Sequence, residues 1–177
     1  LLEYSKVTGD MEIRAEAVAL FWSIREWIVN PALMDRPVFP GGAVVSSLAD
    51  VMVMASMAME LAAVSPDPRY GEIMQECLAA ALRHYDAERR ILMETVAMDG
   101  RSLAGTPEGR LFCPGRSLEV AWFLLHVLQR FPDEARARQG LGIIEGSLGV
   151  GGERGDGGLS GFRVVERRPS AQVGACR

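Results

Sequence analysis

The sequence has few residues of the types that mark several common functional classes. Among its 177 residues are only two histidines and three cysteines, and Cys77, Cys113 and Cys176 have no metal-ligand spacing. There is no basic block and the net charge is -4, so the composition argues against a nucleic-acid surface. An odd cysteine count and the absence of a signal-peptide pattern predict free thiols in a cytoplasmic setting, with no metal and no cofactor.

Long apolar runs are scarce as well. The most apolar stretch, residues 48–64, is rich in methionine and is interrupted only by Asp50, Ser56 and Glu60. It is near the shortest length that crosses a bilayer and carries two carboxylates, which argues against a membrane span. A helix that is apolar on nearly all sides usually lies between other helices, where flexible methionine side chains fill gaps. We therefore expect a buried core helix and no membrane partner.

The chain does have helical periodicity, interrupted by proline and glycine. The spacing of apolar residues predicts helices over residues 1–7, 11–29, 48–64, 69–87, 116–125 and 132–148. This alternation predicts an all-α fold of packed helical hairpins. Residues 91–96 lose the helical period, and we expect them to pair with residues 110–112 as a small β-hairpin. The loop over residues 32–47 is long enough to line a pocket, although it fits a plain connection equally well.

The two ends of the chain carry separate expectations. The first residues, Leu1-Leu2-Glu3-Tyr4, begin without methionine and in the middle of a helical pattern, which suggests a fragment of a longer protein. Residues 1–148 form the predicted helical domain. Residues 149–177 are rich in glycine, and this composition predicts a disordered tail.

One turn and the helix after it carry most of the chemistry. Pro114-Gly115 is a strong turn signal, and the helix that follows places Arg116 and Glu119 three residues apart on one face. The expected apolar stripe beside them is made by four residues: Leu118, Ala121, Trp122 and Leu125. A charged pair at the start of a helix, next to a tryptophan, is typical of the rim of a polar pocket.

These residues resemble a known family. Cys113-Pro114-Gly115-Arg116 followed by Glu119-Val120-Ala121-Trp122-Phe123-Leu124-Leu125 is similar to the Asn-Pro-Gly-His turn and Glu-Ala-Gly-Trp-Phe-Leu-Leu helix of the N-acylglucosamine 2-epimerase family, which includes the renin-binding proteins. Glu94-Thr95-Val96 and Asp99-Gly100 resemble the family's Glu-Asn-Val…Asp-Gly strand and turn. The family's catalytic histidine position is occupied here by Arg116.

The resemblance implies a fold and a reaction. The fold would be part of an (α/α)6 toroid of helical hairpins, with the active site on the loop side. The reaction would interconvert N-acylglucosamine and N-acylmannosamine by removing and returning the proton at C2, which requires two proton-transfer groups. Arg116 stands in the catalytic position, and Glu119 and Glu94 would contact the amino-sugar substrate. The histidines present, His84 and His126, are both expected to be ordinary helix residues.

Several alternatives stay open. Arg116 cannot act as a general base, because a guanidinium stays protonated; it can instead stabilise an enediolate or pair with Glu119 within the helix. Glu119 can bind sugar or simply stabilise the helix dipole. The chain is thus a piece of a sugar isomerase, inactive by itself, or a non-catalytic renin-binding-type protein on the same scaffold, with a possible homodimer. A truncated product without a stable fold is a third possibility.

Overall fold

The computed structural model describes residues 1–30, 33, 45–152 and 158–165, and most of them are helical. The helices are α1 (Leu2–Thr8), α2 (Met11–Val29), α3 (Leu48–Ala62), α4 (Arg69–Leu82), α5 (Pro114–Arg130) and α6 (Glu134–Gly151), with a 3₁₀ turn, η2 (Glu108–Arg110). The strands are β1 (Val45–Ser47), β2 (Tyr85–Asp86), β3 (Ile91–Leu92), β4 (Thr95–Ala97), β5 (Leu111–Phe112) and β6 (Arg163–Val164). The prediction of a mainly helical fold is confirmed.

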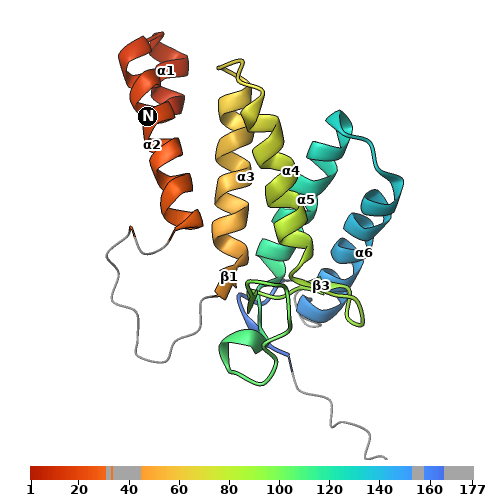
Figure 1. Ribbon diagram of the computed structural model, residues 1–177. Coiled ribbons are helices and arrows are strands. Elements are labelled where there is room, and N and C mark those ends of the chain that lie inside the picture. The colour runs from red at the N-terminus through yellow and green to blue at the C-terminus, as the bar shows by residue number, and fades with distance from the viewer. Residues whose placement is uncertain (31–32, 34–44, 153–157, 166–177) are drawn as a thin grey trace, which may run out of the picture.

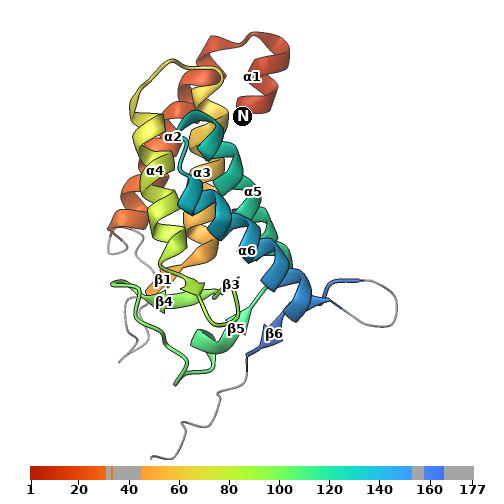
Figure 2. The same cartoon turned by 90° about the vertical axis from the view of Figure 1, so that its right-hand side faces the viewer.

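The helices pack as hairpins, with the strands gathered at one end. The pairs α3–α4 and α5–α6 stand side by side, and α2 packs on α3 (Figure 1). Figure 2 shows the strands collected below the N-terminal ends of α3 and α5. One core of buried side chains joins these helices, and its fully buried members include Leu48, Ala58 and Ala121.

Local sequence signals explain where several helices begin and end. Gly9 ends α1 with a left-handed φ of 74°, a conformation that glycine adopts without strain. The side chain of Asp10 then accepts hydrogen bonds from the backbone N–H groups of Glu12 and Ile13 at the start of α2. Asp133 caps α6 in the same way, and Pro114 occupies the first turn of α5, where its missing N–H costs nothing.

The predicted helix over residues 69–87 is too long. Helix α4 ends at Leu82, and Tyr85 and Asp86 form β2, which pairs antiparallel with β3. The Asp86 side chain accepts hydrogen bonds from the backbone N–H groups of Glu88 and Arg89, and Arg90 adopts a positive φ of 57°. This tight turn reverses the chain against the end of α4, which helical periodicity did not reveal.

The expected hairpin between residues 91–96 and 110–112 is divided among three sheets. Strand β4 pairs with β1, β3 pairs with β2, and β5 pairs with β6. The two predicted partners still touch through a bridge between Met93 and Phe112 and a 3.0 Å hydrogen bond from the Glu94 N–H to the Leu111 carbonyl. The prediction was therefore only partly right: the two segments meet at one bridge, but β3 pairs with its neighbour β2, and β4 and β5 pair with strands from distant parts of the chain.

The glycine-rich end of the chain differs in part from the expected disordered tail. Helix α6 continues past residue 148 to Gly151, and β6 pairs with β5. The N–H of Val165 also donates to the Arg110 carbonyl at 2.8 Å. Strand β6 pairs with β5 and so satisfies backbone hydrogen-bonding groups of both strands. The glycine-rich, weakly apolar sequence around β6 did not predict a strand there. Residues 153–157 and 166–177 lie outside the described residues, so the expectation stays a prediction there. The loop over residues 32–47 also lies largely outside them.

Candidate functional site

Helix α5 begins beside a buried carboxylate. Cys113 precedes the helix in an extended conformation, and Arg116 lies in the first turn. Its Nη1 forms an ion pair and hydrogen bond with Oε2 of Glu94, in the corner between β3 and β4. Glu119 lies one turn further along α5 and is exposed. Of the alternatives left open for Arg116, the ion pair with Glu119 within the helix does not form, and Arg116 pairs across the fold instead.

The backbone of Glu94 makes hydrogen bonds to two other parts of the fold. Its N–H donates to the Leu111 carbonyl, and its own carbonyl accepts the Leu48 N–H at 2.9 Å, which ties it to the first residue of α3. The residue is only 8% exposed. Its Oε1 is buried and has no hydrogen-bond partner among the described residues. Burial raises the pKa of the Glu94 carboxyl, against the opposing effects of the Arg116 charge and hydrogen bond and of the Cys113 N–H.

The buried face of α5 agrees only in part with the predicted stripe: Ala121 is buried, Leu118 and Leu125 are partly buried, and Trp122 is exposed. Its buried side chains include Val120, Ala121, Phe123, Leu124, Val127 and Leu128. Trp122 is 54% exposed and contacts the rings of Phe123 and His126 instead of the core. Glu119, Trp122 and His126 are thus all exposed on α5. The helix is rotated relative to the prediction because its burial follows the contacts with α3, α4 and α6.

At the end of the long loop, Ser46 makes a buried hydrogen bond with His84. Its Oγ lies 2.9 Å from Nε2 of His84, and Nδ1 of the same ring lies 2.8 Å from the Met93 carbonyl. Because a carbonyl only accepts, Nδ1 carries the proton and the Ser46 hydroxyl donates to Nε2. Burial lowers the pKa of His84, Arg83 acts in the same direction, and the Met93 hydrogen bond opposes both. His84 is thus a satisfied core residue in the turn after α4, whereas His126 is exposed.

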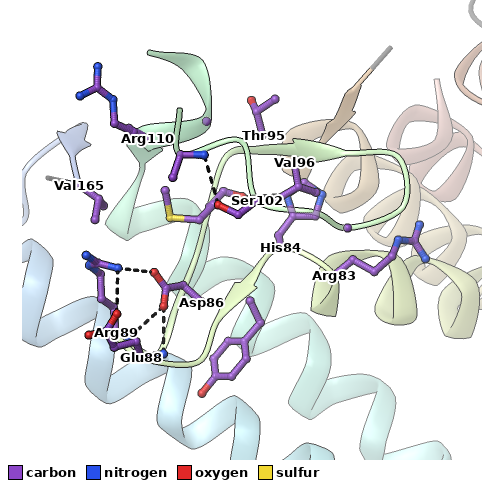
Figure 3. A pocket seen from close by; sticks show the side chains of 15 residues that line it. Arg83, His84, Asp86, Glu88, Arg89, Thr95, Val96, Ser102, Arg110 and Val165 are labelled. Carbon is purple, nitrogen blue, oxygen red and sulfur yellow. Dashed lines mark hydrogen bonds and ion pairs between the residues drawn. The ribbon is translucent and has the colours of Figure 1, made fainter. Parts of the chain in front are cut away.

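A cavity of about 410 Å³ lies on the strand side of the molecule (Figure 3). Residues from the turn after α4, β4 and η2 line it, among them His84, Thr95 and Arg110. Met93 and Thr95 face this cavity, and the side chain of the intervening Glu94 leaves the strand in the opposite direction, toward α5. Glu94, Arg116 and Glu119 do not line this cavity. The residues around the cavity have no motif or spacing that predicted a cavity from the sequence.

Much of the charge at this cavity is neutralised internally. Arg89 forms ion pairs with Asp86 at 2.8 Å and with Glu88 at 3.7 Å (Figure 3). Both ring nitrogens of His84 are occupied, as described above. Within the described part of the chain, no group of three or more His, Cys, Asp or Glu side chains is placed to hold a metal ion. No described helix is both long and apolar enough to cross a membrane.

Comparisons with known proteins point to one family. No family model matches the chain. The rat protein named N-acylglucosamine 2-epimerase (Rattus norvegicus) is 31% identical over 134 residues, which are 74% of this chain and 32% of the rat protein. The mouse protein (Mus musculus) gives the same figures, and the human protein (Homo sapiens) is 28% identical over 139 residues, with 76% and 32% coverage.

The chain spans about a third of the length of the curated relatives it matches. A match that covers three quarters of the chain necessarily includes its central residues, among them Glu94, Arg116 and Glu119. The similarity thus extends over the helical hairpins α3–α4 and the start of α5, where the carboxylate and the guanidinium meet. Over about three quarters of its length, the chain is distantly homologous to these proteins named N-acylglucosamine 2-epimerase.

Proposed function

We propose that this chain is part of a sugar isomerase of the N-acylglucosamine 2-epimerase type, which interconverts N-acylglucosamine and N-acylmannosamine by proton transfer at C2. Its helical hairpins would form part of an (α/α)6 toroid, with α3 and α5 presenting their N-terminal ends to the substrate. The observation that carries the proposal is the Glu94–Arg116 pair at the start of α5, inside the region that matches the epimerases. Taken by itself, the chain would be inactive.

In this proposal Arg116 stabilises charge and does not transfer the proton. A guanidinium stays protonated at every working pH, so it cannot remove the C2 proton. Its side chain is about a quarter exposed, and only the contact of Nη1 with Glu94 is found among the described residues. The remaining N–H groups are available to the enediolate oxygens that form when the proton leaves. The glutamates Glu94 and Glu119 would contact the sugar hydroxyls.

The isomerase reaction requires groups that titrate near neutral pH on both faces of C2. Neither described histidine supplies one beside Arg116, because His84 is bound to Ser46 and Met93 and His126 lies further along α5. Glu94 has a pKa raised by burial and is the titratable side chain in contact with Arg116. It would therefore be the nearest group able to exchange a proton with the site.

The test is deuterium exchange at C2 of N-acetylmannosamine in heavy water, followed by NMR, with the polypeptide that carries this chain. We expect exchange above the protein-free rate. Replacement of Arg116 by histidine should raise the exchange rate by about 100-fold, because it adds a proton-transfer group near neutrality. Replacement of Arg138, an exposed residue of α6, by glutamine is the matched control and should leave the rate unchanged. No exchange by the wild-type protein or by Arg116→His would reject the isomerase.

One observation favours a second function. Arg116 lies in the first turn of α5 and pairs with Glu94, and a guanidinium at this position suits binding but cannot itself transfer the C2 proton. The alternative is a non-catalytic interaction protein on the same scaffold, of the renin-binding type. It predicts that N-acetylmannosamine either binds without C2 exchange or does not bind, while a renin-type protein binds with measurable affinity in calorimetry.

A further inference from the structure

A second cavity lies at the end of the helices away from the strands. It has a volume of about 470 Å³, within the range of roughly 300–1,000 Å³ that is usual for small-molecule sites. It is formed where the C-terminal ends of α3 and α5 meet α4, whereas the Glu94–Arg116 pair lies at the opposite end of α5 (Figure 1). The two places are therefore separated by the length of the helix.

The floor of this cavity is apolar. Its lining includes Met59, Ala62 and Ala63 from α3 and its C-terminus, Met74 from α4, and Val127 and Phe131 from α5 and its C-terminus. Met74 and Val127 belong to the buried core, so the cavity opens directly onto it. The two alanines are too small to fill the space where α3 ends, and methionine side chains adapt to ligands of varied shape. Such a surface suits an alkyl chain.

The rim of the cavity carries positive charge without negative charge. Arg130 and His126 line it together with Gln129, and none of the residues around it is an aspartate or a glutamate. The Arg130 guanidinium lies 5.8 Å from the centre of the Phe131 ring and makes no ion pair or hydrogen bond with the described residues. In the cavity of about 410 Å³ on the strand side, by contrast, the arginines share the wall with Asp86 and Glu88. The charge at this end complements an anion.

We propose that this cavity binds an amphipathic anion: an alkyl chain with one carboxylate, of the medium-chain fatty acid class. The chain lies on the Met59, Met74 and Val127 floor, where burial of apolar surface drives binding. The carboxylate lies at the rim against the Arg130 guanidinium, whose fork of N–H donors matches its two oxygens. This site does not depend on the sugar site or on its activity.

The test uses the 177-residue chain labelled with methyl-13C methionine, and sodium dodecanoate below its micellar concentration as the probe. Saturable shifts of the Met59 and Met74 methyl signals are expected, with no shift at Met11, an exposed residue of α2. Ala63→Trp fills the cavity from an exposed position and should abolish the shifts. Circular dichroism and the Met11 signal report whether this variant is folded, and Ala62→Leu is the second filling variant.

The anion preference is tested separately by calorimetry. Arg130→Gln should weaken dodecanoate binding by about fivefold, as expected for a partly solvated ion pair, and leave dodecanol binding unchanged. The matched control, Arg138→Gln, removes the same charge from α6 and should leave both affinities unchanged. Equal losses in the two arginine variants, uniform shifts of all methionine signals, or undiminished binding by folded Ala63→Trp and Ala62→Leu would each overturn the proposal.

Discussion

At the residue scale, the pairing of Arg116 is the main difference between the predicted and the observed site. Spacing on a helix left Glu119 as one possible partner, since residues three apart are neighbours. The structure joins Arg116 to Glu94, which is 22 residues away in the chain. A carboxylate that is buried without a cation is strongly unfavourable, whereas the exposed Glu119 is solvated by water. The buried Glu94 carboxylate therefore pairs with the Arg116 guanidinium.

This burial gives Glu94 a measurable effect on stability. Its pKa in the folded chain lies above the ordinary value of 4.5, so the folded state holds the proton to a higher pH than the unfolded state does. The free energy of unfolding should then fall as pH rises from about 4.5 through the raised pKa, with a slope of at most about 1.4 kcal/mol per pH unit for one proton. Glu94→Gln should lack this contribution.

Urea unfolding of the wild type and of Glu94→Gln over a series of pH values measures the difference directly. Glu119→Gln is the control, because its carboxylate is exposed. A wild-type stability that follows the same pH dependence as the Glu94→Gln variant would contradict the raised pKa.

At the scale of elements, α6 shows how one helix can contain glycines with opposite roles. A Cβ at Gly146 would lie 2.2 Å from the Arg90 carbonyl oxygen, because the β2–β3 turn packs directly on the helix there. A Cβ at Gly149 would meet nothing within 4 Å, and this residue is exposed. Close approach of backbone explains the first glycine; the structure shows no packing reason for the second.

The two glycines give a matched pair of substitutions. Gly146→Ala should destabilise the chain by about 1–3 kcal/mol, because the turn and the helix must move apart. Gly149→Ala should stabilise it by about 0.5–1 kcal/mol, since alanine favours the helix and nothing opposes its methyl group. Thermal unfolding followed by circular dichroism measures both. Equal effects of the same sign would show that the turn does not pack on α6 as described.

At the scale of the whole molecule, two of the central helices leave apolar side chains exposed. Val53 and Met57 on α3 are each 43% exposed, and Trp122 on α5 is 54% exposed. The expectation that the methionine-rich helix is buried all round was therefore only partly met: Met54 is buried, but Met57 is not. Exposed apolar surface on helices that pack side by side favours association.

We expect the 177-residue chain to self-associate through this surface, in sedimentation velocity over a range of concentrations. The triple variant Val53→Gln, Met57→Gln and Trp122→Gln should shift the equilibrium toward the monomer, since each change removes apolar area that association would bury. A comparison variant with Leu141→Gln and Leu148→Gln removes exposed leucines from α6 and should have a smaller effect. A monomeric wild type, or equal effects of the two variants, would contradict the prediction.

Local signals in the sequence determined the helices and several of their ends. Apolar spacing predicted each of them, and Gly9, Asp10 and Pro114 act at their termini as these residue types do elsewhere. The resemblance to the epimerases also rested on contiguous motifs, which is why it was visible in the sequence alone. Such signals act between neighbours in the chain, so their physical effect can be evaluated without the fold.

Tertiary structure alone decided which distant groups meet. The Glu94–Arg116 pair, the Ser46–His84 hydrogen bond and the β5–β6 pairing each join segments far apart in the sequence. Their formation depends on the cost of burying a charge, a ring nitrogen or a backbone N–H without a partner. That cost exists only after the helices have packed and excluded water, so no pattern of neighbouring residues specifies it.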